Sequence, residues 1–527
     1  MVWRKDDARV CEIGKVRWEL VPFTRGKGLD LGCGPEKGFP HFRGIDSNKD
    51  AALFGIQATA ADFIIPTCEV LDDFASASQE FIVSSHLLEH IKDYEKALRE
   101  WWRILRPGGY LCLYLPHKDF YPNIGTDGAN PDHKHDFHPD DIIAAMNGIG
   151  GWDLVENQDR NEEDEYSFFQ VYKKYADIKV HRYTYREPKP AKTCAIVRYG
   201  AWGDVIQMSS VLPALKEEGY HVTLYTVPRA YDAVKHEPLI DKFIVQDPEQ
   251  VPNAWLGPFW KYLEKKYDKF VNLSSSVEDS LLAMEGRVQF NWNHEARHAY
   301  LNHNYIEHTH RIAAVRFTKP LMRFVATDKE RQWAKEERAR MKAGKLVMWV
   351  LRGSGVQKMW NGGIDESGKQ TGMDGVLARI LITWPDAKIV TVGDQSCKDI
   401  IEPPWVGEPR IIRRSAEWDI RQTMAMAQAC DIVIGPETGV LNAVAMEPMK
   451  KIVFLSHSSV ENLTRDWVNT VSLYSRNTPC YPCHRLIQSW NDCRQEGKTG
   501  IAQCQADIHP SEVWDAICET YAEREAA

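Results

Sequence analysis

Short apolar runs alternate with amphipathic segments along the first third of the chain. The segment from Asp93 to Gly109 has helical periodicity and is predicted to stop at Pro107-Gly108-Gly109. Four apolar runs are predicted to be strands: residues 27–33, 41–47, 80–86 and 110–116. This alternation predicts a parallel sheet with helices on both faces. Residues 152–160 and 166–175 flank an acidic turn and are predicted to form a closing hairpin.

The pattern is then interrupted and begins again twice. Residues 182–192 combine charges with Pro188 and Pro190, which favours an extended connector. A highly charged helix is expected between Thr327 and Lys345. Further strands are expected at 193–200, 221–228 and 267–273, and then at 346–354, 387–394, 430–435 and 450–456. The expected fold class is α/β with three Rossmann-like domains, covering residues 1–180, 193–340 and 341–527, with a linker at 181–192.

Composition agrees with several folded domains and restricts the substrate class. The chain has 527 residues, more than a single hydrophobic core organises. Its residues are 43% apolar and 26% charged, as in ordinary globular proteins. A formal charge of −9 disfavours a broad nucleic-acid-binding face, so small-molecule or carbohydrate substrates are expected. The start has no signal-peptide pattern, and no apolar run approaches the ~18 residues that span a bilayer. A cytoplasmic protein is therefore expected.

The segment GLDLGCGPEKG, residues 28–38, predicts a nucleoside-cofactor site. A buried strand ends there in a glycine-rich turn, where the backbone is able to approach a ligand closely. Asp46 closes the next strand, where a carboxylate can accept hydrogen bonds from both ribose hydroxyls. Asp62 is placed for the adenine amine.

The GxGP turn, the two aspartates, VSSHLLEHIKD and LRPGGYLCLYLP occur in one order. Together they resemble class I methyltransferases of the type 11 group, over roughly residues 15–175. The resemblance implies S-adenosylmethionine as cofactor. It also implies cofactor contacts at Asp30, Gly32, Gly34, Asp46 and Asp62, with Ser85 and His86 lining the pocket beside the sulfonium.

The methyl acceptor is predicted to meet a histidine-rich loop. Methyl transfer to a hydroxyl needs positioning and, where a proton is lost, a base. Residues 116–141 follow the fourth strand and carry several histidines, among which His117, His133 and His135 are candidate bases. A polar loop with helix capping at His138, or a metal site of His and Asp, are the alternatives. For Glu89-His90, packing and capping are expected.

A second motif set begins at residue 194. Gly200 and Gly203 form a turn between strand and helix, with Asp204 at the helix start; this pattern fits either a nucleotide-binding unit or the acceptor half of a two-domain enzyme. The segments CAIVRYGAWGDVIQMSS, RGSGVQKMW, CDIVIGPETGVLNAVAM and FLSHSSVENLTRDW resemble the heptosyltransferase family in order, over residues 193–515.

That resemblance implies a GT-B fold, a nucleotide-sugar donor and inversion at the anomeric carbon. It implies Asp204 as the base and Lys358 as the cation that meets the donor phosphates; a helix cap and a surface charge are the structural alternatives. Thr438 and Gly439 offer backbone amides for phosphate. Glu437 stands where the family usually has Asp, and Asn442 where it usually has His. Heptose and ADP are therefore only family defaults.

Four cysteines cluster late in the chain. Their spacing is suited to a structural zinc ion, with buried thiols or disulfides as alternatives. They are Cys480, Cys483, Cys493 and Cys504.

The two motif sets predict a bifunctional enzyme that glycosylates and methylates a carbohydrate or glycolipid acceptor. One alternative is an enzyme that modifies nucleobases in DNA. Another is a methyltransferase with a non-catalytic GT-B binding module. The sequence predicts no oligomeric state.

Overall fold

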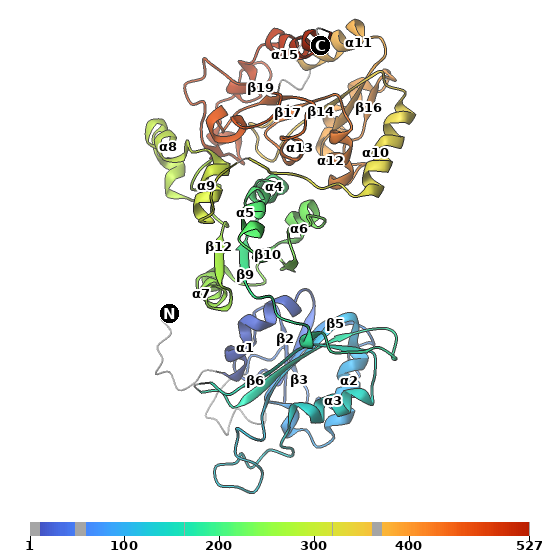
Figure 1. The fold of residues 1–527 in the computed structure, drawn as a ribbon, viewed down its shortest axis with the longest axis vertical. Coiled ribbons are helices and arrows are strands. Elements are labelled where there is room, and N and C mark those ends of the chain that lie inside the picture. Colours follow the sequence, from blue (N-terminus) through green and yellow to red (C-terminus); the bar gives the residue numbers. More distant parts are fainter. Residues whose placement is uncertain (1–10, 48–58, 163, 319, 361–371, 526–527) are drawn as a thin grey trace. The chain divides into compact units, whose positions relative to one another are not determined.

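The computed structural model describes residues 11–47, 59–162, 164–318, 320–360 and 372–525 (Figure 1). The chain divides into two compact units. The first comprises Met1–Ala191 with Val245–Lys266, and the second Lys192–Ile244 with Tyr267–Ala527. Within the described residues, no helix combines the length and apolar character needed to cross a membrane.

The first unit is built on one eight-stranded sheet with the order β3-β2-β1-β4-β5-β7-β6-β8. Strands β1 to β5 pair in parallel, and β7 runs antiparallel to both β5 and β6, as the predicted hairpin requires. The strand order reverses at β1, which lies between β2 and β4. The strands are β1 Gly28–Leu31, β2 Arg43–Asp46, β3 Phe63–Ile64, β4 Gln79–Ser85, β5 Leu105–Pro116, β6 Trp152–Arg160, β7 Ser167–Lys174 and β8 His181–Arg182.

Helices lie on both faces of this sheet, as predicted (Figure 1). On one face, α2 (Tyr94–Ile104) and α3 (Pro139–Asn147) share a core with the sheet in which Trp101 and Trp152 are fully buried. The helix α1 (Glu12–Leu20) lies on the other face. His138 begins α3 with a capping box, so the predicted helix start there is confirmed.

The predicted end of the long helix is wrong by a few residues. Helix α2 ends at Ile104, and Leu105 to Gly109 already belong to β5. The physical reason is that proline disfavours helical backbone in the residue before it, and Gly108 has a φ of 84°. The predicted connector also begins later, because β8 pairs with β6 and a short 3-10 turn follows at Thr184–Arg186.

The described part of the second unit contains three sheets, the smallest of which is a parallel pair of β13 (Ala283–Met284) and β20 (Arg485–Leu486). A four-stranded sheet has the order β11-β10-β9-β12, a six-stranded sheet has the order β16-β15-β14-β17-β18-β19, and all neighbours whose register is given are parallel. The strands are β9 Thr193–Val197, β10 His221–Thr226, β11 Lys242–Val245, β12 Lys269–Asn272, β14 Lys345–Val350, β15 Ala387–Val392, β16 Ile411–Arg413, β17 Ile432–Pro436, β18 Lys450–Phe454 and β19 Thr470–Leu473. All seven strands expected in this region are present; β11, β13, β16, β19 and β20 were not expected. The α/β fold class is confirmed.

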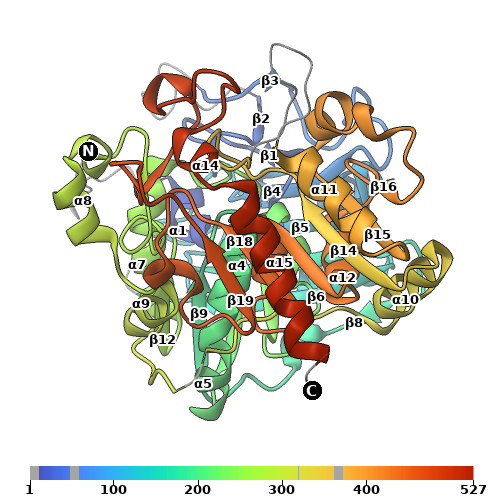
Figure 2. The same ribbon diagram turned by 90° about the horizontal axis from the view of Figure 1, so that it is seen from above.

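The helices of the second unit cover these sheets. The charged helix α10 begins with a capping box between Thr327 and Glu330, as its sequence predicts. Helix α15 packs against β18 and β19 (Figure 2). The others are α4 Trp202–Met208, α5 Leu212–Glu217, α6 Pro228–Val234, α8 His294–Leu301, α9 Tyr305–Ile312, α10 Asp328–Met341, α11 Gly372–Thr383, α12 Ile420–Gln428, α13 Gly439–Ala443, α14 Gln503–Ala506 and α15 Pro510–Glu525, with α7 Leu256–Lys266 in the first unit.

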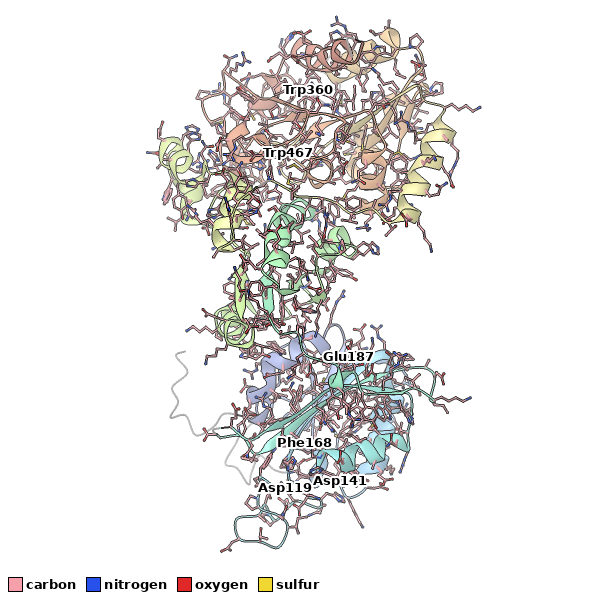
Figure 3. The ribbon with its side chains drawn as sticks, in the orientation of Figure 1. Asp119, Asp141, Phe168, Glu187, Trp360 and Trp467 are labelled. Atoms are coloured by element: carbon pink, nitrogen blue, oxygen red, sulfur yellow. The ribbon has the colours of Figure 1, made fainter. Side chains whose placement is uncertain are left out.

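The four-stranded and six-stranded sheets of the second unit share one hydrophobic core. A continuous cluster of buried side chains includes Ile196 of β9 and Leu224 of β10, together with Met348 of β14 and Val433 of β17. A separate cluster covers the other face of the six-stranded sheet, where Trp360 is buried and stacks on Phe454 (Figure 3). The shared core therefore fixes the two sheets to each other through side chains from both.

Candidate functional site

The glycine turn after β1 leaves room for a ligand. Gly32 and Gly34 have φ values of 69° and 55°, which glycine adopts readily. The Gly34 N–H donates to Asp46 Oδ2 at 2.8 Å, and a Cβ placed on Gly34 would meet no atom of the described residues within 4 Å. This turn lies where the strand order reverses, the position at which open α/β sheets bind ligands.

Two other predicted cofactor contacts hold the backbone near this turn. Asp30 is buried and accepts the Gly38 N–H at 2.8 Å, and burial raises the pKa of Asp30 to about 7. Asp62 accepts the Gly44 N–H and pairs with Lys37 at 2.9 Å. Against the effect of burial, these two donors lower the pKa of Asp62. The Asp62 carboxylate is 44% exposed, so it remains accessible to a ligand.

The end of β4 brings polar side chains toward the same turn. Leu87 packs against Gly32, since a Cβ on that glycine would lie 3.0 Å from the leucine side chain. Ser85 Oγ is buried and has no hydrogen-bond partner among the described residues. His86 has a φ of 50°, its Nε2 lies 2.9 Å from Ser167 Oγ, and burial lowers its pKa to about 3. The imidazole of His86 is therefore neutral.

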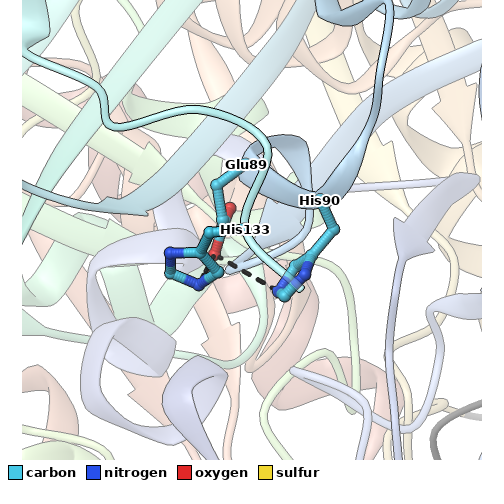
Figure 4. Close-up of side chains that lie close together, drawn as sticks. All are labelled: Glu89, His90 and His133. Atoms are coloured by element: carbon cyan, nitrogen blue, oxygen red, sulfur yellow. Dashed lines mark ion pairs between the residues drawn. The ribbon is translucent and has the colours of Figure 1, made fainter. Parts of the chain in front are cut away.

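Glu89 and His90 follow shortly after Leu87, and their side chains meet His133 from the loop after β5. We call these three residues the Glu89 cluster (Figure 4). Glu89 is fully buried, and neither of its carboxylate oxygens has a hydrogen-bond partner among the described residues. His90 Nε2 and His133 Nε2 lie 3.9 and 4.0 Å from Glu89 Oε1. Burial raises the pKa of Glu89 to about 8 and lowers that of His133 to about 4.

The three predicted bases do not lie together. His133 belongs to the Glu89 cluster, whereas His135 Nε2 lies 3.0 Å from the Ile91 carbonyl oxygen. His117 stacks on Phe120 and accepts the Asp119 N–H at its Nδ1. Each histidine of the loop thus has a different environment, which their spacing in the sequence does not reveal.

In the second unit, Asp204 stands in the first turn of α4. Its Oδ2 accepts the Ala201 N–H at 2.8 Å, and its Oδ1 lies 3.4 Å from Arg198. The cap at the start of the helix is thus present, but the side chain is still 31% exposed. A carboxylate in this position is held in place and remains accessible.

Glu437 follows β17 and organises the turn after β18. It accepts the Ser456 N–H at 2.6 Å and the Ser458 hydroxyl at 2.9 Å, and its Oε2 lies 2.7 Å from His457 Nε2. Burial raises its pKa, but His457, Lys358 and the Ser456 amide outweigh that effect and lower the pKa to about 2. Glu437 is thus an anion that is already surrounded by protein donors.

Lys358 lies in the loop after β14 and shares this electrostatic environment. Burial lowers the pKa of Lys358, while the carboxylates of Glu437 and Asp204 act in the opposite direction. Its aliphatic chain packs beside Gly353, where a Cβ would lie 2.7 Å from Lys358 Cδ. The three charged groups therefore influence one another across the second unit.

Thr438 and Gly439 begin α13, and this helix approaches α4 closely. Thr438 caps the helix, and a Cβ on Gly439 would lie 2.9 Å from Trp202 Cβ. Gln207 Nε2 donates to Asn442 Oδ1 at 2.6 Å. Asn442, which differs from the family pattern, thus joins the two halves of the second unit.

The four late cysteines line one cavity of about 50 Å³. All four are free thiols, of which Cys480 is exposed and Cys483 and Cys504 are buried. Burial raises the pKa of Cys483 to about 12 and that of Cys493 to about 11. Among the described residues, however, no three of these sulfur atoms are grouped within 4.8 Å of one another, so zinc at these thiols stays a prediction.

Comparison with known proteins identifies part of the first unit. Residues 29–113 match the family model of a methyltransferase domain. This region is a methyltransferase domain. No curated protein matches the chain.

Comparison with solved structures finds chains that match part of this one. The glycosyl transferase family 9 protein from Veillonella parvula is 14% identical, covers 63% of this chain and 98% of its own, and has a TM-score of 0.46. The ADP-heptose lps heptosyltransferase II of E. coli is 13% identical, with 63% and 99% coverage and a TM-score of 0.45. The YcgJ protein from Bacillus subtilis is 15% identical, with 32% and 99% coverage and a TM-score of 0.24.

Sequence reasoning assigned no chemical role to several residues that the structure places at these sites. In the methyltransferase domain, Glu12 Oε2 lies 3.6 Å from His86 Nε2. Glu89, which was expected only to pack or to cap a helix, lies in the same region. In the second unit, His457 pairs with Glu437. A polar run directly after an apolar strand, as in FLSHSS, is the sequence signal that could have indicated His457.

Proposed function

We propose that the chain is a bifunctional transferase. It transfers a methyl group from S-adenosylmethionine to a hydroxyl of a carbohydrate or glycolipid acceptor. It also transfers a sugar from a nucleotide-activated donor with inversion. We place it in the cytoplasm, a reducing compartment, which is supported by the free state of all its cysteines.

The methyl-transfer proposal is carried by the open glycine turn at the strand-order reversal of the methyltransferase domain. The space in front of Gly34, the exposed side of Asp62 and the unpartnered Ser85 hydroxyl fit a nucleoside cofactor with a polar methionyl end. S-adenosylmethionine supplies an electrophilic methyl group there. The chain's own residues bind the nucleoside, orient it and hold the acceptor.

We place the acceptor hydroxyl beside the Glu89 cluster. Leu87 connects this cluster to the glycine turn, because it packs on Gly32 and is followed directly by Leu88–His90. Of the predicted bases, His133 lies in this cluster. Positioning of the two reactants supplies much of the acceleration in such a reaction.

Binding of S-adenosylmethionine, measured by calorimetry, tests the first activity. Asp46→Ala removes the carboxylate that holds the Gly34 amide and is expected to weaken binding at least tenfold. The matched control is Asp72→Ala, at an exposed position of the same domain. Failure of the wild-type chain to bind S-adenosylmethionine would overturn the proposal.

The glycosyl-transfer proposal is carried by the position of three charged side chains. Asp204, Lys358 and Glu437 each follow the carboxyl end of a parallel strand, β9, β14 and β17, and they are electrostatically coupled. We assign Asp204 to accept the proton of the acceptor hydroxyl and Lys358 to offset the charge of the leaving diphosphate. Glu437 holds the loop that contains His457, and the Thr438 and Gly439 amides face the donor phosphates.

Product analysis by mass spectrometry with a panel of nucleotide sugars and candidate glycans tests this second activity. Asp204→Asn is expected to abolish transfer while nucleotide binding remains, and Lys358→Ala to weaken nucleotide binding. Lys335→Ala, at an exposed position of α10, is the control. Undiminished transfer by Asp204→Asn would show that this carboxylate is only a helix cap.

A further inference from the structure

The buried carboxylate of Glu89 is the unexplained group of the methyltransferase domain. It is fully buried, and within the part of the chain that the structure describes it accepts no hydrogen bond. Leaving a buried polar group unsatisfied costs about 1 to 3 kcal/mol, and more when the group is charged. A cation bound against these oxygens would remove that cost.

Imidazole nitrogens approach the same oxygen from three directions. His86 Nδ1, His90 Nε2 and His133 Nε2 lie 3.9, 3.9 and 4.0 Å from Glu89 Oε1. The ligand atoms of Glu89, His90 and His133 all lie within 4.8 Å of one another. Figure 4 shows that the two imidazoles and the carboxylate lie close together. Ligands about 2.1 Å from an ion are roughly 3.4 Å apart in a tetrahedral site, so small side-chain rotations close the site.

The surroundings hold these side chains in place. The Lys134 and His135 amides donate to the Glu89 carbonyl oxygen at 2.7 and 3.2 Å, which fixes the histidine loop against Leu88–His90. The other ring nitrogen of His86 meets the Ser167 hydroxyl and lies 3.6 Å from Glu12. Metal-binding histidines are commonly oriented by such a contact at the second nitrogen.

We propose that Glu89, His90 and His133 bind one divalent first-row transition-metal ion, and that the acceptor hydroxyl of the methyl-transfer reaction binds to this ion. A carboxylate with two imidazoles is a donor set that leaves coordination positions open for a substrate oxygen. His86 Nδ1 is close enough to serve as a further ligand.

The role in catalysis rests on the proposed methyl transfer. The acceptor oxygen gives its proton to water and forms a bond to the methyl carbon while the carbon–sulfur bond breaks, so the positive sulfonium becomes a neutral thioether. No electron is gained or lost. The ion lowers the pKa of the hydroxyl that it binds.

A second group of possible ligands serves as an internal control. His117, Asp119 and His138 also place three ligand atoms within 4.8 Å. However, His117 Nδ1 and His138 Nδ1 already accept backbone N–H groups, and Asp119 is exposed (Figure 3). The thiols of the second unit prefer softer ions, so Mn²⁺ is the probe that best separates the sites.

The test uses the full chain after treatment with a chelator, titrated with Mn²⁺ and followed by electron paramagnetic resonance. Wild type and Asp119→Asn are expected to bind one ion with the same affinity, whereas Glu89→Gln and His133→Gln are expected to lose at least tenfold. His90→Gln changes a partly exposed ligand and should show the same loss with little effect on folding, which circular dichroism monitors.

Calorimetry with S-adenosylmethionine on the same proteins separates the two proposals. Lost Mn²⁺ binding with retained cofactor binding in Glu89→Gln supports the metal site. No Mn²⁺ binding by wild type, or equal binding by wild type and all three ligand variants, overturns it. Mn²⁺ binding without any cofactor binding would support the metal site and overturn methyl transfer together with the ion's role in it.

Discussion

Replacing Glu437 with glutamine tests how the loop after β18 is held. The carboxylate is 3% exposed, and its nearest titratable neighbours are His457, whose pKa burial lowers, and Lys358, with Asp204 close enough to influence both. Burial opposes its ionisation, yet these partners lower the pKa from an ordinary 4.5 to about 2. This difference corresponds to at most about 3 kcal/mol of unfolding free energy at neutral pH, because burial also lowers the pKa of His457 and so reduces the positive charge beside Glu437 there.

The sign of the pH dependence follows from the lowered pKa. The contribution is complete above the unfolded-state pKa of 4.5 and is lost as the pH falls toward 2. Glu437→Gln has no carboxyl group to titrate. Its deficit against wild type should therefore be at most about 3 kcal/mol near neutral pH and should shrink as the solution is acidified.

Differential scanning calorimetry at neutral and acidic pH measures this deficit. For a unit of this size, a deficit of up to about 3 kcal/mol lowers Tm by up to roughly 6 °C. Glu402→Gln is the matched control, because the Glu402 carboxylate is buried and accepts the hydroxyls of Thr391 and Ser415 rather than charged partners. A Tm for Glu437→Gln equal to wild type near neutral pH, or a deficit that does not change with pH, would refute the reasoning.

Three further substitutions have expected outcomes. Gly34→Ala places a side chain at a φ of 55° in front of the glycine turn, so we expect a loss of about 1 kcal/mol and at least tenfold weaker S-adenosylmethionine binding; unchanged calorimetric affinity would contradict this. Gly439→Ala pushes α13 against Trp202 and should lower the free energy of unfolding by about 1 to 3 kcal/mol, as measured by thermal unfolding. Gly375→Ala lies in α11, where the added Cβ meets no atom of the described residues within 4 Å, and it should raise the free energy of unfolding by up to about 1 kcal/mol. If the four thiols hold zinc, elemental analysis should find about one zinc ion fewer per chain in Cys483→Ser than in wild type and Cys518→Ser, whatever metal the Glu89 cluster binds; equal zinc in all three would exclude the thiol site.

Strands were the most predictable part of the fold. Buried parallel strands are continuous apolar runs, such as TCAIV in β9 and KKIVF in β18, and the sequence alone locates them. The short edge strand β16 has only three residues and half-buried side chains, so it leaves no comparable pattern. The end of α2 was misplaced because the glycines and the proline that stop a helix are here already part of β5.

The glycine turn and its aspartates could be located from spacing, but their partners could not. Asp30 and Asp46 accept amides of the turn itself, which depends on backbone directions that spacing does not encode. Which histidine meets Glu89 depends on how residues 117–138 fold back onto Leu88–His90. Contacts of this kind form only when the loop and the sheet are both in place.

The core shared by the four-stranded and six-stranded sheets of the second unit also limits how this protein can be divided for study. Ile196 and Leu224 belong to the same buried cluster as Met348 and Val433, so a chain cut between Ala326 and Asp328 would expose apolar surface on both fragments. Neither fragment is expected to stay dispersed when produced alone. Co-expression of the two fragments should restore a folded unit if their complementary faces meet before either aggregates.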